Sequence, residues 1–196
     1  MRSAASKWRL LAAVFLLGLL ADQATKFLAV DRLTTAFQRA GARTAGEKLQ
    51  AFWTLRHLEP VATEPHYVFR PWWRMAYVEN PNAAFGLGSF LPPGPRYAVF
   101  LLFAAGALGA ILWFYRRLQP GQWLHQVTLA LVFTGATGNF VDRLARRYVI
   151  DFIEWYWWNR PDLRWPTFNL ADSYLSVGIV LLLFLPQGKP APKKAE

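Results

Sequence analysis

The chain alternates long apolar segments with polar ones, and this pattern is the first guide to its fold. We expect four membrane spans, at about residues 10–30, 97–115, 123–141 and 167–185. The segment Tyr97–Tyr115 is the clearest of them, because it carries no charged residue and about 20 apolar residues cross a bilayer as a helix. The pattern predicts an all-α membrane protein with four transmembrane helices, forming one integral membrane domain over residues 1–196.

The first apolar run, Leu10–Ala21, could by itself be the core of a cleaved signal peptide. The apolar pattern resumes at Phe27–Val30, however, which lengthens the segment enough to span a bilayer. Three further apolar segments follow it. We therefore favour a retained first span.

A long polar stretch, residues 31–96, separates the first two spans. Within it, Thr44–Leu55 predicts a short amphipathic helix, and Met75–Glu79 predicts a strand. The helix would place four residues on one side: Ala45, Leu49, Phe52 and Trp53. Trp72 and Trp73 are typical of interfacial anchors.

Composition supports a membrane protein. Of the 196 residues, 54% are hydrophobic and only 17% are charged, below the usual quarter of a soluble domain. The absence of cysteine excludes disulfides and cysteine nucleophiles, and the three histidines lack ligand spacing, so we expect no metal and no cofactor. The net charge of +10 would suit nucleic acid, but the basic residues flank the apolar segments, so we expect no nucleic-acid partner.

The basic residues also predict an orientation. Residues 1–9, the pair Arg116-Arg117 and the tail 186–196 lie on the same side of a four-span protein, and all three are basic. By the positive-inside rule this side is cytoplasmic, so we expect both termini there and the loops 31–96 and 142–166 outside.

This orientation places the polar motifs of the spans at one depth, near the outer interface. Asp22 and Lys26, four residues apart, share a helix face and can pair. That pair could mark the end of the span at the interface, or could be a polar patch turned into the bundle. Asn139 and Asp142 lie at the outer end of the third span. Asn169 and Asp172 lie at the outer start of the fourth.

Asp151 lies in the apolar sequence Val149–Phe152, which suggests a loop that dips back into the membrane interface. If Asp151 and Asp172 approach each other, repulsion and desolvation favour one retained proton near neutral pH. A carboxylate and a carboxylic acid together can activate water and protonate a peptide carbonyl. The alternative is that Asp151, and Asp142 beside Arg143, form structural ion pairs.

Most of these residues fall in five ordered blocks. The blocks are Asp22–Lys26 (DQATK), Asn80–Gly86 (NPNAAFG), Gly138–Arg143 (GNFVDR), Val149–Phe152 (VIDF) and Phe168–Asp172 (FNLAD). In this order they resemble the motifs of the lipoprotein signal peptidases, the type II signal peptidases of bacteria. The resemblance covers nearly the whole chain.

The resemblance implies that Asp151 and Asp172 are the catalytic pair of an aspartic endopeptidase. It also implies residues that hold substrate or support the site: Asp22, Lys26, Asn80, Asn139, Arg143 and Asn169. Gly138 and Asp142 would maintain the architecture.

The family's substrate is a diacylglyceryl-modified prolipoprotein, cut just before its lipidated cysteine. We therefore expect this substrate and membrane lipid as partners, a monomer, a place in the bacterial inner membrane, and a small β-like cradle over the site on the outer (periplasmic) side.

The chain departs from the family pattern in three places. Asn82 replaces a glycine, and Thr134-Gly135 stands where a double glycine is common. The first outer loop is longer by about two dozen residues, with an inserted segment at about 32–72. That insertion could change substrate choice, add a partner contact or be an inert elaboration, and we favour the last.

Two other function classes compete with the peptidase. One is a non-catalytic membrane protein that binds signal peptides or lipids in the same groove. The other is a small transporter with the aspartates as a proton relay. Two convergent aspartates favour the enzyme over a binder, and polar groups at a single depth disfavour a transporter.

Overall fold

The protein is described by a computed structural model that covers residues 4–55, 61–81, 92–158 and 160–185. Within these ranges six helices and four strands form. The helices are α1 (Ala4–Leu33), α2 (Ala36–Arg39), α3 (Ala45–Thr54), α4 (Pro93–Arg117), α5 (Trp123–Arg146) and α6 (Leu170–Phe184). The strands are β1 (His66–Phe69), β2 (Trp73–Asn80), β3 (Val149–Trp157) and β4 (Arg160–Arg164).

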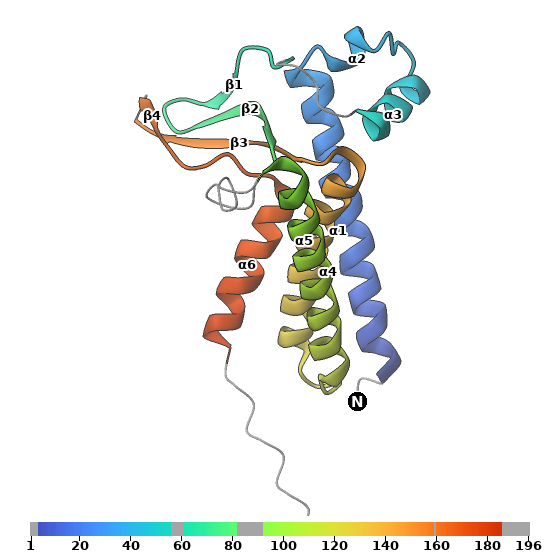
Figure 1. Cartoon of the computed structure of the whole chain (residues 1–196). Coiled ribbons are helices and arrows are strands. Elements are labelled where there is room, and N and C mark those ends of the chain that lie inside the picture. Colours follow the sequence, from blue (N-terminus) through green and yellow to red (C-terminus); the bar gives the residue numbers. More distant parts are fainter. Residues whose placement is uncertain (1–3, 56–60, 82–91, 159, 186–196) are drawn as a thin grey trace, which may run out of the picture.

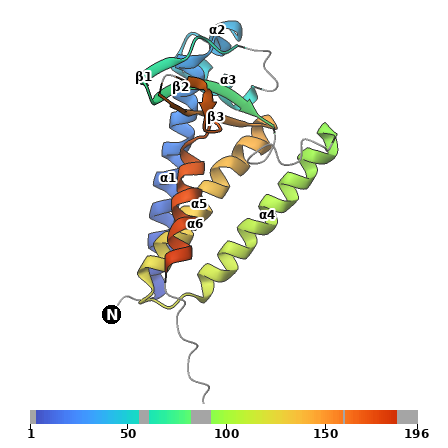
Figure 2. The same ribbon diagram turned by 90° about the vertical axis from the view of Figure 1, so that its left-hand side faces the viewer.

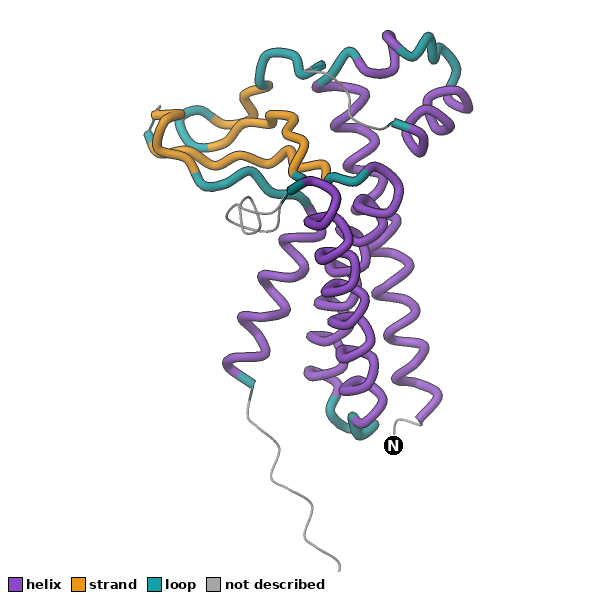
Figure 3. Tube along the Cα trace, viewed as in Figure 1, coloured by secondary structure: helices purple, strands orange, loops and turns teal. Residues whose placement is uncertain are grey.

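The four longest helices form a bundle, and the strands lie across the end opposite the N-terminus (Figure 1, Figure 3). Each predicted span falls on one of these helices, except that α6 begins three residues later than expected. Two of the described helices, Ala5–Leu33 and Tyr97–Arg117, are long and apolar enough to cross a membrane by length and composition. The count of four spans therefore stays a prediction.

Helix α5 is the centre of the bundle and contacts α1, α4 and α6. It is less apolar than its neighbours because it buries polar side chains between them, among them Gln126, Thr128 and Thr134. Small residues permit close approach on this helix: a methyl group added at Gly138 would lie 2.6 Å from Asp22 Oδ2. Helix α4 leans away from the other helices at its end nearer the sheet (Figure 2).

The strands form one antiparallel sheet in the order β1-β2-β3-β4. The predicted strand at Met75–Glu79 is confirmed as part of β2. The expectation of a loop around Asp151 is wrong, because Val149–Phe152 belongs to β3 in the interior of the sheet. That this segment dips into the membrane interface stays a prediction. Val149, Ile150 and Phe152 are at most 3% exposed, so their apolar character reflects burial on both faces of the strand.

The described part of the inserted segment folds against the end of the bundle that carries the sheet. The predicted amphipathic helix is confirmed as α3, which Thr44 and Glu47 begin with a reciprocal capping box. The predicted apolar face is only partly correct. Phe52 is 1% exposed and packs edge-on against Phe27, whereas Leu49 is 53% exposed.

Aromatic side chains gather on the β3–β4 hairpin. Trp72 packs edge-on against Trp157 and Trp158, with ring centroids 4.9 and 5.4 Å apart. Trp155 and Trp165 are each more than half exposed. This exposed aromatic surface is consistent with the predicted interfacial role of the tryptophans.

Candidate active site

Asp151 and Asp172 approach the same cavity from different elements. Asp151 lies on β3, and Asp172 lies in the first turn of α6. The cavity has a volume of about 630 Å³ and is bounded by the sheet and by the ends of α5 and α6 nearest to it. Asn80, Asn139 and Arg143 also line it.

The spacing of Asn169 and Asp172 has a local cause. Asn169 is the N-cap of α6, and its side-chain oxygen accepts a hydrogen bond from the Asp172 backbone N–H at 2.9 Å. In return, the Asp172 carboxylate accepts one from the Asn169 backbone N–H at 3.1 Å. This capping box fixes the direction of the Asp172 side chain at the start of the helix.

Asparagine side chains link the two carboxylates. The Asn169 amide donates to Asp151 Oδ1 at 2.7 Å and to Asn139 Oδ1 at 3.1 Å. The Asn139 amide in turn donates to Asp172 Oδ1 at 2.7 Å. Asn80, at the end of β2, donates to Asp151 Oδ2 at 2.9 Å. The predicted residues on four separate elements thus converge on one hydrogen-bonded group.

The environment of Asp151 favours its protonated form. Only 2% of the residue is exposed, and burial raises its pKa to about 7, with the negative charge of Asp172 adding to the effect. Hydrogen bonds from Asn80 and Asn169 act in the opposite direction. A carboxyl with this pKa is present in both protonation states near neutral pH.

A buried charge network lies behind the asparagines. Lys26 Nζ lies 2.8 Å from Asp22 Oδ2 and 3.0 Å from Asp142 Oδ2, and all three side chains are at most 1% exposed. The predicted pairing of Asp22 with Lys26 is confirmed, and the pair is turned into the bundle. Lys26 also donates to Asn139 Oδ1 at 3.3 Å, which joins this network to the asparagines.

The two carboxylates of this network hold the backbone beside the candidate catalytic residues. Asp142 Oδ2 accepts the backbone N–H of Ile150 at 3.1 Å, one residue before Asp151. Asp22 Oδ1 accepts the backbone N–H of Ala171 at 3.0 Å, one residue before Asp172. The network therefore positions both elements that carry the pair.

Sequence reasoning missed two members of this network. It considered Arg143 as the ion-pair partner of Asp142, whereas Arg146 Nη1 forms the salt bridge, at 2.9 Å. A spacing of four residues on a helix was the available signal. Gln23 was quoted only as part of a motif, yet its amide donates to both Asp22 Oδ2 and Asp142 Oδ1 at 3.1 Å.

Arg143 lies on the cavity wall beside the carboxylates, and its Nη1 donates to the Asn139 carbonyl at 3.2 Å. Asn82 and the residues that follow it in the Asn80–Gly86 block lie outside the described residues.

The helical bundle under a small antiparallel sheet, with two carboxylates in a cavity at its end, has the fold of a class of bacterial membrane enzymes. A solved bacterial membrane enzyme shares this fold, with a TM-score of 0.64 and 22% sequence identity over 88% of this chain and 89% of that one.

Comparisons with known sequences identify the family. Residues 14–186 match the family model of signal peptidase (SPase) II. A lipoprotein signal peptidase of Anaeromyxobacter sp. (strain Fw109-5) is 57% identical over 190 residues, covering 97% of this chain and 90% of the relative. One from Geobacter sulfurreducens is 42% identical over 109 residues, covering 55% of this chain and 64% of the relative. The chain belongs to the signal peptidase II family, and it is an aspartic peptidase.

Proposed function

We propose that this protein removes signal peptides from diacylglyceryl-modified prolipoproteins, cutting just before the lipidated cysteine, with Asp151 and Asp172 as the catalytic pair. The observation that carries the proposal is the connection from Asp151 through Asn169 and Asn139 to Asp172, at the head of a cavity. This connection holds the two carboxyl groups beside one cavity. Because the pair can activate a water molecule, the reaction requires no nucleophilic side chain.

The chemistry follows from the unequal environments of the two groups. With the pKa of Asp151 raised to about 7, the pair holds one proton near neutral pH. The ionised carboxylate accepts a proton from water as the water oxygen attacks the peptide carbonyl, and the carboxylic acid protonates the carbonyl oxygen. The resulting tetrahedral intermediate collapses when the leaving amine receives a proton, and the C–N bond breaks.

The supporting residues divide into those at the cavity and those behind it. Asn80 and Asn169 hold Asp151, Asn139 holds Asp172, and Arg143 supplies a positive charge on the wall beside the substrate. Asp22 and Lys26 with Asp142 fix the backbone, and Gly138 leaves room for Asp22.

The cavity extends from the aspartates along an apolar side of α6, where Leu175, Val177 and Ile179 line it. This continuation suits a substrate that carries acyl chains and an apolar signal helix. A substrate bound in this way has its peptide bond beside the carboxylates, and its acyl chains and signal helix lie beside the helices of the bundle.

The orientation in the membrane belongs to the same proposal. The apolar helices suit a protein of the bacterial inner membrane. Four spans, with both termini cytoplasmic, put the carboxylates near the outer face and the sheet outside as a cradle over the substrate. One chain supplies all the proposed catalytic groups, so a monomer suffices.

The test is cleavage of a purified lipidated preprolipoprotein in detergent. We expect the native protein to release the signal peptide, and Asp151→Asn and Asp172→Asn each to lower the rate by about a thousandfold. Cleavage that persists in either variant would contradict the assigned pair. Retained substrate binding without cleavage by the native protein would instead support a non-catalytic binder.

A further inference from the structure

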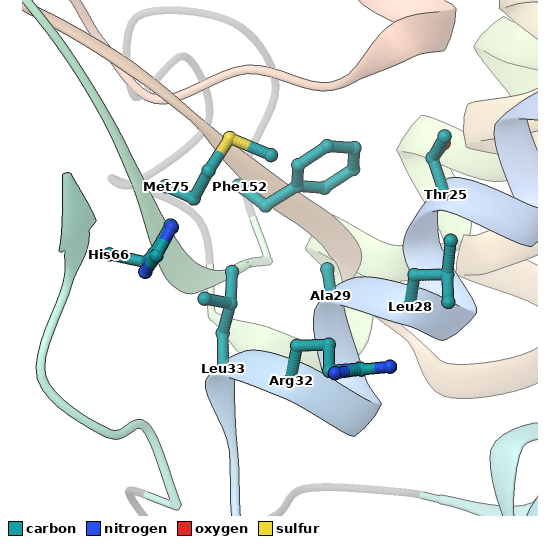
Figure 4. A pocket seen from close by; sticks show the side chains of 8 residues that line it. All are labelled: Thr25, Leu28, Ala29, Arg32, Leu33, His66, Met75 and Phe152. Carbon is teal, nitrogen blue, oxygen red and sulfur yellow. The ribbon is translucent and has the colours of Figure 1, made fainter. Parts of the chain in front are cut away.

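A second cavity lies between α1 and β3 (Figure 4). Its volume is about 450 Å³, and it opens between the outer part of α1 and the first three strands. The residues that line it are Thr25, Leu28, Ala29, Arg32, Leu33, His66, Met75 and Phe152. Among the residues that the structure describes, none lines both this cavity and the active-site cavity.

The two cavities use opposite faces of one strand. Asp151 lines the active-site cavity, and the next residue, Phe152, lines the second one. This follows from the alternation of side chains along a strand. Any group that fills the second cavity would therefore pack against β3 directly behind the proposed catalytic residue.

The wall of the second cavity changes from apolar to basic along α1. At the inner end the Thr25 hydroxyl donates to the carbonyls of Ala21 and Asp22, so its polar group is already satisfied by the helix. Leu28 follows, and Arg32 stands at the outer end. Thr25 and Arg32 are seven positions apart on the helix, or about 10 Å along the axis.

The outer rim carries two basic side chains, and none of the described lining residues is acidic. The Arg32 side chain is 79% exposed, and its contact with Asp31 is long, at 3.5 Å. Asp31 makes its shorter salt bridge with Lys48, at 2.6 Å. Arg32 can thus still offer its planar N–H groups to a phosphate.

We infer that this cavity binds an anionic phospholipid of the outer leaflet, with an acyl chain against Leu28, Met75 and Phe152 and the phosphate at Arg32. The order of the wall matches the order of a lipid in that leaflet, with hydrocarbon toward the bundle and phosphate outside. The inference rests on the proposed orientation of the chain. It concerns a membrane lipid, since the acyl chains of a substrate are tied to the peptide on the other side of β3.

The test counts bound lipid directly. Purified full-length protein is mixed with equal amounts of phosphatidylglycerol and phosphatidylethanolamine in detergent, and retained lipid is measured by native mass spectrometry. We expect one retained lipid, with phosphatidylglycerol preferred. Arg32→Gln should weaken that binding about fivefold, the effect of one basic residue near an anionic surface. Leu28→Trp, which fills the cavity, should remove most of it.

Two matched variants serve as controls. Arg39→Gln removes the same charge at an exposed position of α2, and Leu102→Trp adds the same bulk on α4, where Leu102 is 75% exposed. Both should retain lipid as the native protein does. Equal retention by Leu28→Trp, no preference for the anionic lipid, or no bound lipid would each overturn the inference. Asp151→Asn should keep the lipid, so a failure of the proposed cleavage is distinguishable from a failure of lipid binding.

Discussion

The carboxylate of Asp142 accepts the backbone N–H of Ile150 at 3.1 Å, so a residue of helix α5 fixes the strand directly before Asp151. The same oxygen lies 3.0 Å from Lys26 Nζ, and the other oxygen of Asp142 lies 2.9 Å from Arg146. One buried carboxylate therefore connects α1, α5 and β3. Its removal would leave two buried cations with fewer partners, which is costly in a low-dielectric interior.

We predict that Asp142→Asn destabilises the protein by about 3 kcal/mol and lowers the cleavage rate. Asparagine keeps the size of the side chain but not the charge that Lys26 and Arg146 require. Thermal unfolding in detergent and the rate of signal-peptide release are the measurements. Asp162→Asn is the control, because Asp162 and Arg160 form an exposed pair with side chains about 60% accessible. Native stability in Asp142→Asn would show that the network is dispensable.

The pKa of Asp151 predicts the pH dependence of cleavage. The protonated form of the pair is lost as pH rises through about 7, so the rate should fall on the basic side with an apparent pKa near that value. This apparent pKa belongs to the pair of aspartates. For stability the sign is the same: a carboxyl whose folded pKa is raised binds more protons when folded, so its contribution is lost as pH rises from about 4 to about 7.

A single variant tests the cause of this pH dependence. The hydrogen bond from Asn80 lowers the pKa of Asp151, so Asn80→Ala should move the basic limb of the rate profile to higher pH. Gln38→Ala, at an exposed position of α2, should leave the profile in place. A shift to lower pH in Asn80→Ala would refute this account.

Most residues of the candidate site could be predicted because the sequence patterns that indicate them are local. The capping box that orients Asp172 and the pairing of Asp22 with Lys26 each depend on residues three or four positions apart. The strand around Asp151 was misread because a strand buried on both faces has no alternation, and so resembles a segment in the membrane interface. The predicted apolar face of α3 was partly wrong because the helix docks through one side chain, Phe52. Tertiary contacts decide which side chain is buried, and the sequence of the helix alone does not show them.

The inserted segment is where the sequence was least informative. We favoured an inert elaboration, yet α3 is joined to the charge network. Arg146 lies over the Phe52 ring, 3.9 Å from its centroid, and its Nε donates to the Phe52 carbonyl at 3.1 Å. Since Arg146 also pairs with Asp142, the insertion contacts the residue that holds the backbone beside Asp151. These contacts join residues 94 positions apart, which no local pattern reveals.

We therefore predict that Phe52→Ala destabilises the protein by about 3 kcal/mol and also slows cleavage. Phe52→Leu, which keeps most of the apolar volume, should retain more of the stability. Leu49→Ala on the same helix is the control, because Leu49 is 53% exposed. The measurements are thermal unfolding and cleavage rate. If the Phe52→Ala protein cleaves at the native rate, the insertion is an inert elaboration and this prediction is wrong.

The last prediction concerns the space between α5 and α1. A methyl group at Gly138 would lie 2.6 Å from Asp22 Oδ2 and 3.0 Å from the Ala171 side chain, too close for either to stay in place. Because Asp22 accepts the Ala171 N–H beside Asp172, Gly138→Ala should displace Asp172 and lower the cleavage rate about a hundredfold. Gly109→Ala, where an added methyl meets nothing within 4 Å, should leave the rate unchanged. If both variants cleave alike, Asp22 does not need its close contact with α5, and the positioning role assigned to it is wrong.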